Sequence, residues 1–189
     1  AAQSNIIGYC LGGTLLAGLL AYLKGTGAAD QVASATFQTT MIDFEEPGDL
    51  GVFIDDDQIR SLEQKMSRDG YLDGTDMATT FNMLRSNDLI WSFVINNYLM
   101  GDEPLAFDLL YWNSDSTRMP AKMHSEYLRT MYLENRFKEP GGMVLDGVAI
   151  DIPSVDTPCY FLSTQEDHIA PWRSTFAGAS LLAGPVRFV

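Results

Sequence analysis

The sequence predicts an α/β fold in which a parallel sheet is interrupted by a long, mostly helical insertion. Three observations support this prediction. Near the N-terminus, a strand, a glycine-rich turn, a helix and a second strand follow one another, which is the pattern of a parallel sheet. Residues 43–150 then lack a clear parallel-strand pattern, and strand patterns return in residues 151–189.

The first segment, residues 1–42, contains the strand–turn–helix–strand unit. An apolar strand is predicted over residues 6–9 and a glycine-rich turn over residues 10–13. Residues 14–24 are apolar nearly all round, which is typical of a well-buried helix. A further strand is predicted over residues 32–39. This segment is expected to form one part of the sheet core.

The second segment, residues 43–150, is predicted to be an inserted cap subdomain. It opens with an acidic loop rich in proline and glycine. Apolar residues then recur at helical spacing, which predicts four helices, over residues 57–69, 75–85, 88–100 and 121–136. An aromatic run occupies residues 107–112.

The third segment, residues 151–189, is predicted to return to the sheet core. It contains a strand over residues 158–163, a polar loop, a helix over residues 171–182 and a last strand over residues 187–189. The chain opens without Met and ends inside a strand pattern, whereas domains usually end in polar, exposed segments. We therefore expect an internal piece of a longer protein and an incomplete fold.

The composition restricts the partners. There are 25 Asp and Glu against 12 Lys and Arg, a formal net charge of −13, which argues against nucleic acid and anionic membranes as general partners. No apolar run reaches the roughly 18 residues of a transmembrane helix. The two cysteines are too few for a disulfide framework and show no metal-binding spacing. We expect a reducing, cytoplasmic setting, no metal and no cofactor.

The most informative motif is Gly8-Tyr9-Cys10-Leu11-Gly12, a G-x-C-x-G pattern between a strand and a helix. This is the context of the nucleophile elbow of α/β-hydrolase folds. Glycines at 8 and 12 would let strand and helix approach closely. A helix N-terminus would lower the pKa of the Cys10 thiol, and the N–H of Leu11 would help to stabilise an oxyanion. The alternative is that Cys10 is a small, inert core residue.

The partners of Cys10 follow from the chain order of this fold, which is nucleophile, acid, histidine. Asp167 follows a predicted strand, as the acid should; the alternative is that it only caps a turn or the next helix. His168 is adjacent to Asp167, so the two side chains would point apart. His124 precedes the acid and lies in the predicted cap. We therefore expect the base to lie beyond Val189, and the 189-residue chain to be inactive alone.

Five segments of the chain resemble the polyhydroxyalkanoate synthases, most closely the class I, short-chain type. They are G-Y-C-L-G-G-T (8–14), S-N-D-L-I-W-S-F-V-I-N-N-Y-L-M-G (86–101), F-D-L-L-Y-W-N-S-D-S-T-R-M-P (107–120), Y-L-R-T-M-Y-L-E-N (127–135) and E-D-H-I-A-P-W (166–172). The resemblance implies an α/β-hydrolase core with a cap and a Cys-Asp-His triad. The nucleophile matches Cys10 and the acid matches Asp167, while His168 matches a position that is not the base.

The resemblance also implies a function: an acyltransferase that polymerises (R)-3-hydroxyacyl-CoA, releases CoA and keeps the growing polyester on a cysteine thioester. It implies a homodimer at the surface of cytoplasmic polyester granules. The aromatic run over residues 107–112 would then line an acyl or polymer channel or, alternatively, pack the core of the cap. Two other functions stay open, a cysteine-dependent hydrolase of esters or lactones and a non-catalytic interaction domain.

Overall fold

The computed structural model describes residues 3–84, 90–104, 109–115 and 117–189, and it divides into two compact units. Unit 1 comprises Ala1–Asp56 and Glu126–Val189, and unit 2 comprises Asp57–Ser125. The predicted cap, residues 43–150, extends beyond unit 2 at both ends. The three predicted ranges, 1–42, 43–150 and 151–189, stay a prediction, because a segment inserted in the sequence can pack partly with the unit that it interrupts.

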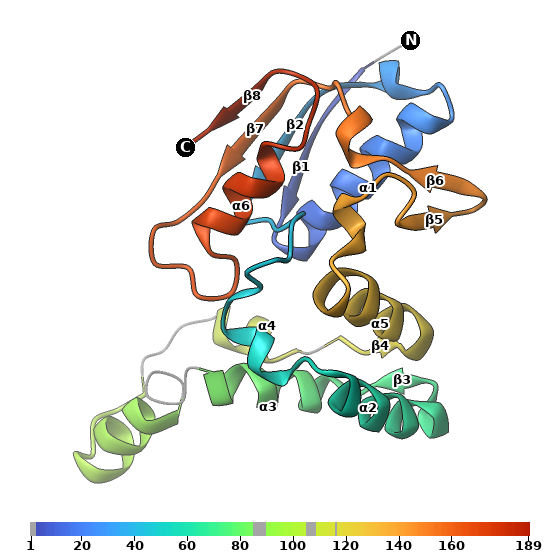
Figure 1. The fold of residues 1–189 in the computed structure, drawn as a ribbon. Helices are drawn as coiled ribbons and strands as arrows, with labels where there is room; N and C mark the ends of the chain where they lie inside the picture. The colour runs from blue at the N-terminus through green and yellow to red at the C-terminus, as the bar shows by residue number, and fades with distance from the viewer. Residues whose placement is uncertain (1–2, 85–89, 105–108, 116) are drawn as a thin grey trace. The chain divides into compact units, whose positions relative to one another are not determined.

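Unit 1 is built on a four-stranded sheet in the order β1-β2-β7-β8 (Figure 1). Every neighbouring pair of strands is parallel. The strands are β1 (Ser4–Tyr9), β2 (Val32–Gln38), β7 (Cys159–Leu162) and β8 (Val186–Phe188). All four strands predicted from the sequence are therefore confirmed, with bounds shifted by one or two residues.

Two helices of unit 1 pack on the same face of this sheet, α1 (Leu11–Gly25) and α6 (Trp172–Ala179). On that face the rings of Phe37 and Phe161 stack at 4.4 Å between centroids, and both are fully buried. The described part of the unit also contains four short 3-10 helices: Ala29–Gln31, Gly48–Phe53, Arg136–Lys138 and Ile152–Ser154. The core thus lies between the sheet and its two covering helices.

A β-hairpin in unit 1 was not predicted from the sequence. Its strands are β5 (Met143–Leu145) and β6 (Val148–Ile150), which pair antiparallel. Asp146 and Gly147 form the turn with φ of 45° and 78°, as a two-residue hairpin with positive φ at both positions requires. Ile150 is fully buried in the core of unit 1. The hairpin therefore belongs to the sheet unit, although it falls inside the predicted cap.

Unit 2 is mostly helical. Its elements are α2 (Asp56–Asp69), β3 (Tyr71–Leu72), α3 (Gly74–Leu84), the π-helix η4 (Val94–Leu99), α4 (Leu109–Ser114), β4 (Met119–Pro120) and α5 (Ala121–Tyr127). The predicted helices over 57–69 and 75–85 are confirmed to within one residue. The predicted helix over 88–100 and the aromatic run over 107–112 fall partly outside the described residues. None of the described helices is long and apolar enough to cross a membrane.

The predicted helix over 121–136 changes its winding partway. The α-helical part ends at Tyr127, and the π-helix η5 (Leu128–Leu133) follows. The N–H of Glu134 donates to the carbonyl of Arg129 at 2.9 Å, a spacing of five residues that defines π-helical bonding. Asn135 then adopts a left-handed conformation, with φ of 50°. The predicted helix over residues 121–136 is therefore present as an α-helix followed by a π-helix, and it ends at Leu133.

The turn from β1 into α1 depends on two glycines. A Cβ on Gly8 would lie 2.6 Å from Cα of Gly13, and a Cβ on Gly13 would lie 1.9 Å from Oγ1 of Thr40. By contrast, a Cβ on Gly12 would meet nothing within 4 Å. The close approach that the motif placed at Gly8 and Gly12 is therefore found at Gly8 and Gly13.

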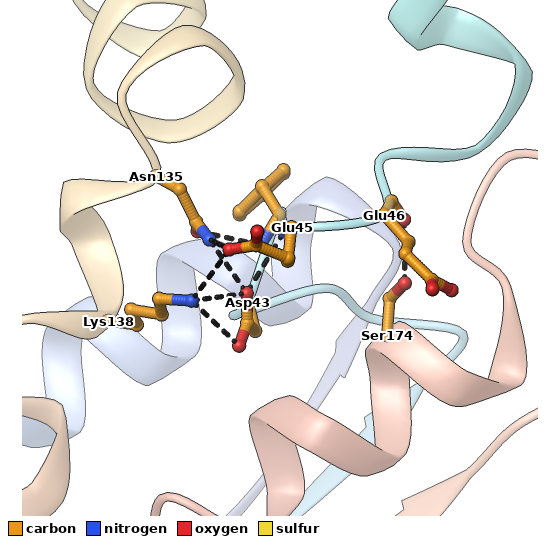
Figure 2. A network of polar contacts seen from close by, with 7 residues as sticks. Asp43, Glu45, Glu46, Asn135, Lys138 and Ser174 are labelled. Atoms are coloured by element: carbon orange, nitrogen blue, oxygen red, sulfur yellow. Dashed lines mark hydrogen bonds and ion pairs between the residues drawn. The ribbon is translucent and has the colours of Figure 1, made fainter.

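A cluster of four polar residues joins the segment after β2 to the turn after η5 (Figure 2). This Asp43 cluster consists of Asp43, Glu45, Asn135 and Lys138. Asn135 accepts a hydrogen bond from the N–H of Phe44 and donates one to Asp43, both at 2.8 Å. The Lys138 ammonium lies 3.1 Å from both carboxylate oxygens of Asp43. Burial alone would raise the pKa of Asp43, but the hydrogen bonds from Asn135, the Glu45 N–H and Lys138 lower it overall.

Gly13→Ala is expected to destabilise the protein by about 1–3 kcal/mol, the usual cost of overpacking, because the added methyl group would overlap Thr40. Gly12→Ala is the matched control. It adds the same group one position earlier, in open space, and helix propensity predicts that it is neutral or stabilising by up to about 1 kcal/mol. Denaturant unfolding of both variants measures the difference. Equal effects at the two positions would contradict the packing seen here.

Asp43→Asn is expected to cost about 1–2 kcal/mol of stability near pH 7, because it removes a charge-assisted network. A carboxylate with a lowered pKa in the folded state contributes stability above its unfolded pKa of about 4, and this contribution is lost as the pH falls further. The difference from the parent protein should therefore shrink between about pH 5 and pH 2. Unfolding curves of both proteins across this pH range test whether the difference shrinks. Glu139→Gln, at an exposed position, is the control. A difference independent of pH would contradict the role given to the carboxylate.

Candidate active site

Cys10 occupies a strained turn between β1 and α1. Its φ is 51° and its ψ is −122°, and a non-glycine residue in such a region costs on the order of 1–3 kcal/mol. The backbone compensates with specific bonds: the N–H of Cys10 donates to the carbonyl of Gln38 at 2.9 Å, and the Cys10 carbonyl accepts from the N–H of Gly13 at 2.9 Å. This strained strand-to-helix turn has the form of a nucleophile elbow.

The surroundings of the Cys10 thiol raise its pKa. Burial is the largest cause, the hydrogen bond from the N–H of Leu11 acts in the opposite direction, and the negative charge of Asp167 raises the pKa further. The sequence predicted a lowered pKa from the helix N-terminus. That prediction is wrong because the helix contributes one N–H while the fold also removes the sulfur from water. A base is therefore needed to generate the thiolate at neutral pH.

Asp167 lies in the loop that follows β7, at the same edge of the sheet as Cys10. Its Oδ1 accepts hydrogen bonds from the N–H groups of Ile169 and Ala170, both at 2.9 Å, so Asp167 shapes its own turn. Its charge also acts on the Cys10 thiol. The turn-forming and the electrostatic interpretation of Asp167 are thus compatible with each other.

The two histidines occupy different surroundings. The backbone carbonyl of His168 accepts a hydrogen bond from the N–H of Asp49 at 2.9 Å, and His168 is half-buried. His124 is buried in α5, within unit 2, and burial lowers its pKa. That neither histidine is the base of the triad stays a prediction. Within the described ranges, no group of three or more His, Cys, Asp or Glu residues is arranged to hold a metal ion.

A small cavity of about 20 Å³ adjoins Cys10. Its wall is formed by Cys10, Leu11, Thr14, Thr39, Met41, Phe44, Tyr127, Tyr132, Ile169 and Ala170. Thr39 has a φ of 44°, an outlier for a β-branched residue. Such strained residues cluster at functional sites, and here both Thr39 and Cys10 line one cavity. A space of this volume has room for about one water molecule.

Three aromatic residues in this wall were not predicted as site residues: Phe44, Tyr127 and Tyr132. The ring of Tyr132 meets Phe44 edge-on at 4.8 Å and Tyr127 edge-on at 5.4 Å. In an α-helix, residues five apart lie on different faces, so the spacing of the two tyrosines gave no signal. The π-helical winding of η5 brings them together.

Some of the hydroxyl groups in the wall already donate hydrogen bonds within the protein. Thr14 Oγ1 donates to the carbonyl of Met41 at 2.8 Å, and Tyr127 Oη donates to Tyr132 Oη at 3.5 Å. Burial is the main cause that raises the pKa of both phenols, and the charge on Cys10 contributes in the same direction. The two phenol oxygens therefore lie within electrostatic range of the sulfur.

A larger hollow of about 340 Å³ lies over β2, β7 and β8. It is lined by Ser34, Ala35, Thr36, Pro158, Cys159, Tyr160, Pro185, Val186 and Arg187. Cys159 is buried there, and burial raises its pKa to about 11. Since Cys10 lines the smaller cavity and does not border this hollow, the smaller cavity is the candidate active site.

Comparison with a solved structure confirms the fold class. BpoC of Mycobacterium tuberculosis, described as a candidate non-heme bromoperoxidase, superposes with a TM-score of 0.53 over 100% of this chain and 57% of its own, at 12% sequence identity. At that identity the likeness concerns the fold alone. Together with the parallel sheet and the elbow, it identifies an α/β-hydrolase-type fold.

Comparison with curated proteins identifies the family. No protein-family model matches the chain. The chain is 57% identical over 187 residues to "Poly(3-hydroxyalkanoate) polymerase subunit PhaC" of Rhizobium meliloti, and this alignment covers 99% of the chain and 30% of that protein. It is 54% identical over 182 residues to "Poly(3-hydroxyalkanoate) polymerase" of Methylorubrum extorquens, covering 96% of the chain and 30% of that protein. It is 41% identical over 190 residues to the PhaC subunit of Cupriavidus necator, covering 98% of the chain and 32% of that protein.

The chain thus spans about 30% of the length of these two curated relatives. The matches extend over nearly the whole chain, including the elbow at Cys10 and the loop at Asp167. By its sequence, this chain belongs to the poly(3-hydroxyalkanoate) polymerase family, the family that its motifs predicted.

Proposed function

We propose that this chain is the nucleophile-bearing part of an acyltransferase that polymerises (R)-3-hydroxyacyl-CoA, with 3-hydroxybutyryl-CoA as the short-chain substrate, and releases CoA. One observation carries the proposal: a cysteine stands at the strained elbow of an α/β-hydrolase-type fold, in a chain 57% identical to a protein named as a poly(3-hydroxyalkanoate) polymerase subunit. The cysteine can carry the acyl group as a thioester.

In the loading step, the Cys10 thiolate attacks the thioester carbonyl of the acyl-CoA. The new carbon–sulfur bond forms at Cys10, the bond to the CoA sulfur breaks, and the CoA thiolate takes up a proton. One thioester replaces another, so the step is close to balanced. The N–H of Leu11, which hydrogen-bonds the sulfur, is proposed to help to stabilise the oxyanion.

In the elongation step, the 3-hydroxyl of one acyl unit attacks the thioester carbonyl of another. An ester bond forms, the carbon–sulfur bond breaks and the thiolate is released, while the hydroxyl proton passes to a general base. Water would compete with that hydroxyl. The cavity beside Cys10 has a volume of only about 20 Å³ and mostly apolar walls, which limits the water that reaches the acyl-enzyme.

The base of the triad is proposed to be a histidine outside this chain, oriented by Asp167. The raised pKa of Cys10 supports this requirement, since burial and the charge of Asp167 both hold the thiol protonated. A histidine between the two would take the thiol proton, and its positive charge would be stabilised by Asp167. The same arrangement would accept the hydroxyl proton in elongation.

The partners proposed for the complete enzyme are the acyl-CoA substrate, the growing polyester and a second copy of the enzyme. The proposed location is the surface of polyester granules in the cytoplasm. The names of the relatives support the polyester product. The net charge of −13 favours neither nucleic acid nor an anionic membrane as a partner.

The function is tested with a polymerase that contains these residues together with the segment that supplies the histidine, incubated with 3-hydroxybutyryl-CoA. The expected result is insoluble polyester, stoichiometric CoA release and a mass increase on Cys10. Cys10→Ala should abolish all three, and Cys159→Ala, which removes the other cysteine, should retain them. Soluble 3-hydroxybutyrate alone would instead indicate a hydrolase. A Cys10 that resists alkylation in the complete protein would indicate a non-catalytic domain.

Asp167→Asn is expected to have opposite effects on two measurements. Polymerisation should fall on the order of 100-fold or more, because the histidine loses its orienting charge. In the 189-residue chain, without the proposed histidine, the pKa of Cys10 should fall, because the negative charge that raises it is gone, so iodoacetamide should alkylate Cys10 faster at pH 7.

Asparagine retains an oxygen that can accept from the N–H groups of Ile169 and Ala170, so the turn is preserved. Glu166→Gln, at the exposed neighbouring position, is the control and should change neither rate. A parallel loss of both rates in Asp167→Asn would indicate a damaged loop in place of a missing charge.

A further inference from the structure

The cavity beside Cys10 contains a phenol that the chemistry above does not use. We infer that Tyr132 selects hydroxyacyl groups over plain acyl groups, by donating a hydrogen bond from its phenol to the 3-hydroxyl of the acyl group on Cys10. The inference deepens the proposed function and rests on it. It makes Tyr132 a specificity-determining residue of the loading step.

The size of the cavity matches a hydroxyl group. Its volume of about 20 Å³ accommodates a group as large as one water molecule, whereas a four-carbon acyl chain is several times larger. An acyl group on Cys10 can therefore place only a small part of itself in this space. The 3-hydroxyl is borne by the second carbon beyond the thioester carbonyl, and it is the polar group of the acyl chain that is about as large as a water molecule. The rest of the acyl chain would extend out of the cavity.

Four residues of the wall carry a hydroxyl group: Thr14, Thr39, Tyr127 and Tyr132. Met41, Phe44, Ile169 and Ala170 are apolar, and the hydroxyl of Thr14 already donates to the carbonyl of Met41. Tyr132 accepts a hydrogen bond from Tyr127, which leaves its own proton to be donated elsewhere. Accepting that bond also polarises the Tyr132 O–H and makes it a better donor.

The position of Tyr132 is fixed from two sides. Its ring is only 9% exposed and packs edge-on against Phe44 and Tyr127. Phe44 is itself held by the Asp43 cluster, because its N–H donates to the side chain of Asn135. A donor held this firmly loses little entropy when it binds its partner, which is the condition for discrimination.

The discrimination follows from the cost of an unpaired buried group. A site built to hydrogen-bond a hydroxyl rejects an analogue that lacks it, because the buried donor of the protein is then left without an acceptor. Butyryl-CoA differs from 3-hydroxybutyryl-CoA only in that hydroxyl. The parent enzyme should therefore acylate Cys10 faster with the hydroxylated donor, and the preference should depend on the Tyr132 phenol.

The experiment compares Tyr132→Phe with the parent in the same complete polymerase. The measurement is single-turnover acylation of Cys10, followed by intact mass, with 3-hydroxybutyryl-CoA and with butyryl-CoA. Butyryl-CoA cannot polymerise but can load, so both donors report the same step. Tyr132→Phe retains the ring and its edge-on contacts and removes only the hydroxyl. Tyr22→Phe, on α1 and outside the cavity wall, is the matched control.

Tyr132→Phe is expected to lower kcat/KM for loading of 3-hydroxybutyryl-CoA by about 10–100-fold and not to lower it for butyryl-CoA, because the phenylalanine has no donor to leave unpaired, so that the preference disappears. Phe44→Leu should slow both donors alike, because it changes the shape of the wall and no hydrogen bond to the substrate. If Tyr132→Phe still loads 3-hydroxybutyryl-CoA in preference to butyryl-CoA by the parent's ratio, the inference is overturned. This holds whether the two loading rates stay at the parent's level or fall together. A parent enzyme that does not acylate Cys10 at all would overturn the proposed function as well.

Discussion

The site depends on one constraint, the left-handed conformation that the chain adopts at Cys10. It persists because the Cys10 N–H is tied to Gln38 on the neighbouring strand and because Gly8 and Gly13 allow α1 to approach β1 and Thr40. That turn fixes where the sulfur lies, which N–H faces it and which strand ends surround it. The loop of Asp167 and the strained Thr39 meet Cys10 because parallel strands end at one edge of the sheet.

Much of this arrangement could be predicted from the sequence, because it is local. The strand, glycine-rich turn and helix around Cys10 are adjacent in the chain, and a buried strand followed by a polar loop indicates where Asp167 lies. The order of the elements then indicates a parallel sheet. The sheet core and two candidate catalytic positions required no knowledge of distant contacts.

The cavity wall could not be predicted, because its causes are not local. Tyr127 and Tyr132 share a face only through π-helical winding, which no periodicity in the sequence signals. Asp43 and Lys138 lie 95 residues apart, so their ion pair follows from the completed fold. The direction of the pKa shift of Cys10 likewise depends on how much of the sulfur the surrounding residues bury. The Asp146-Gly147 hairpin is different, since that dipeptide is a known turn signal and the turn could have been predicted from it.

The raised pKa of Cys10 also bears on how long such an enzyme lasts. Peroxides attack thiolates, and oxidation beyond the sulfenic acid cannot be reversed by ordinary thiols. The proposed polymerase would keep one sulfur in use through many additions, so a single oxidation would end the growth of a chain. A thiol kept protonated by burial is a poor target for peroxide between substrates. The desolvation that makes Cys10 dependent on a base thus also protects it chemically while it waits.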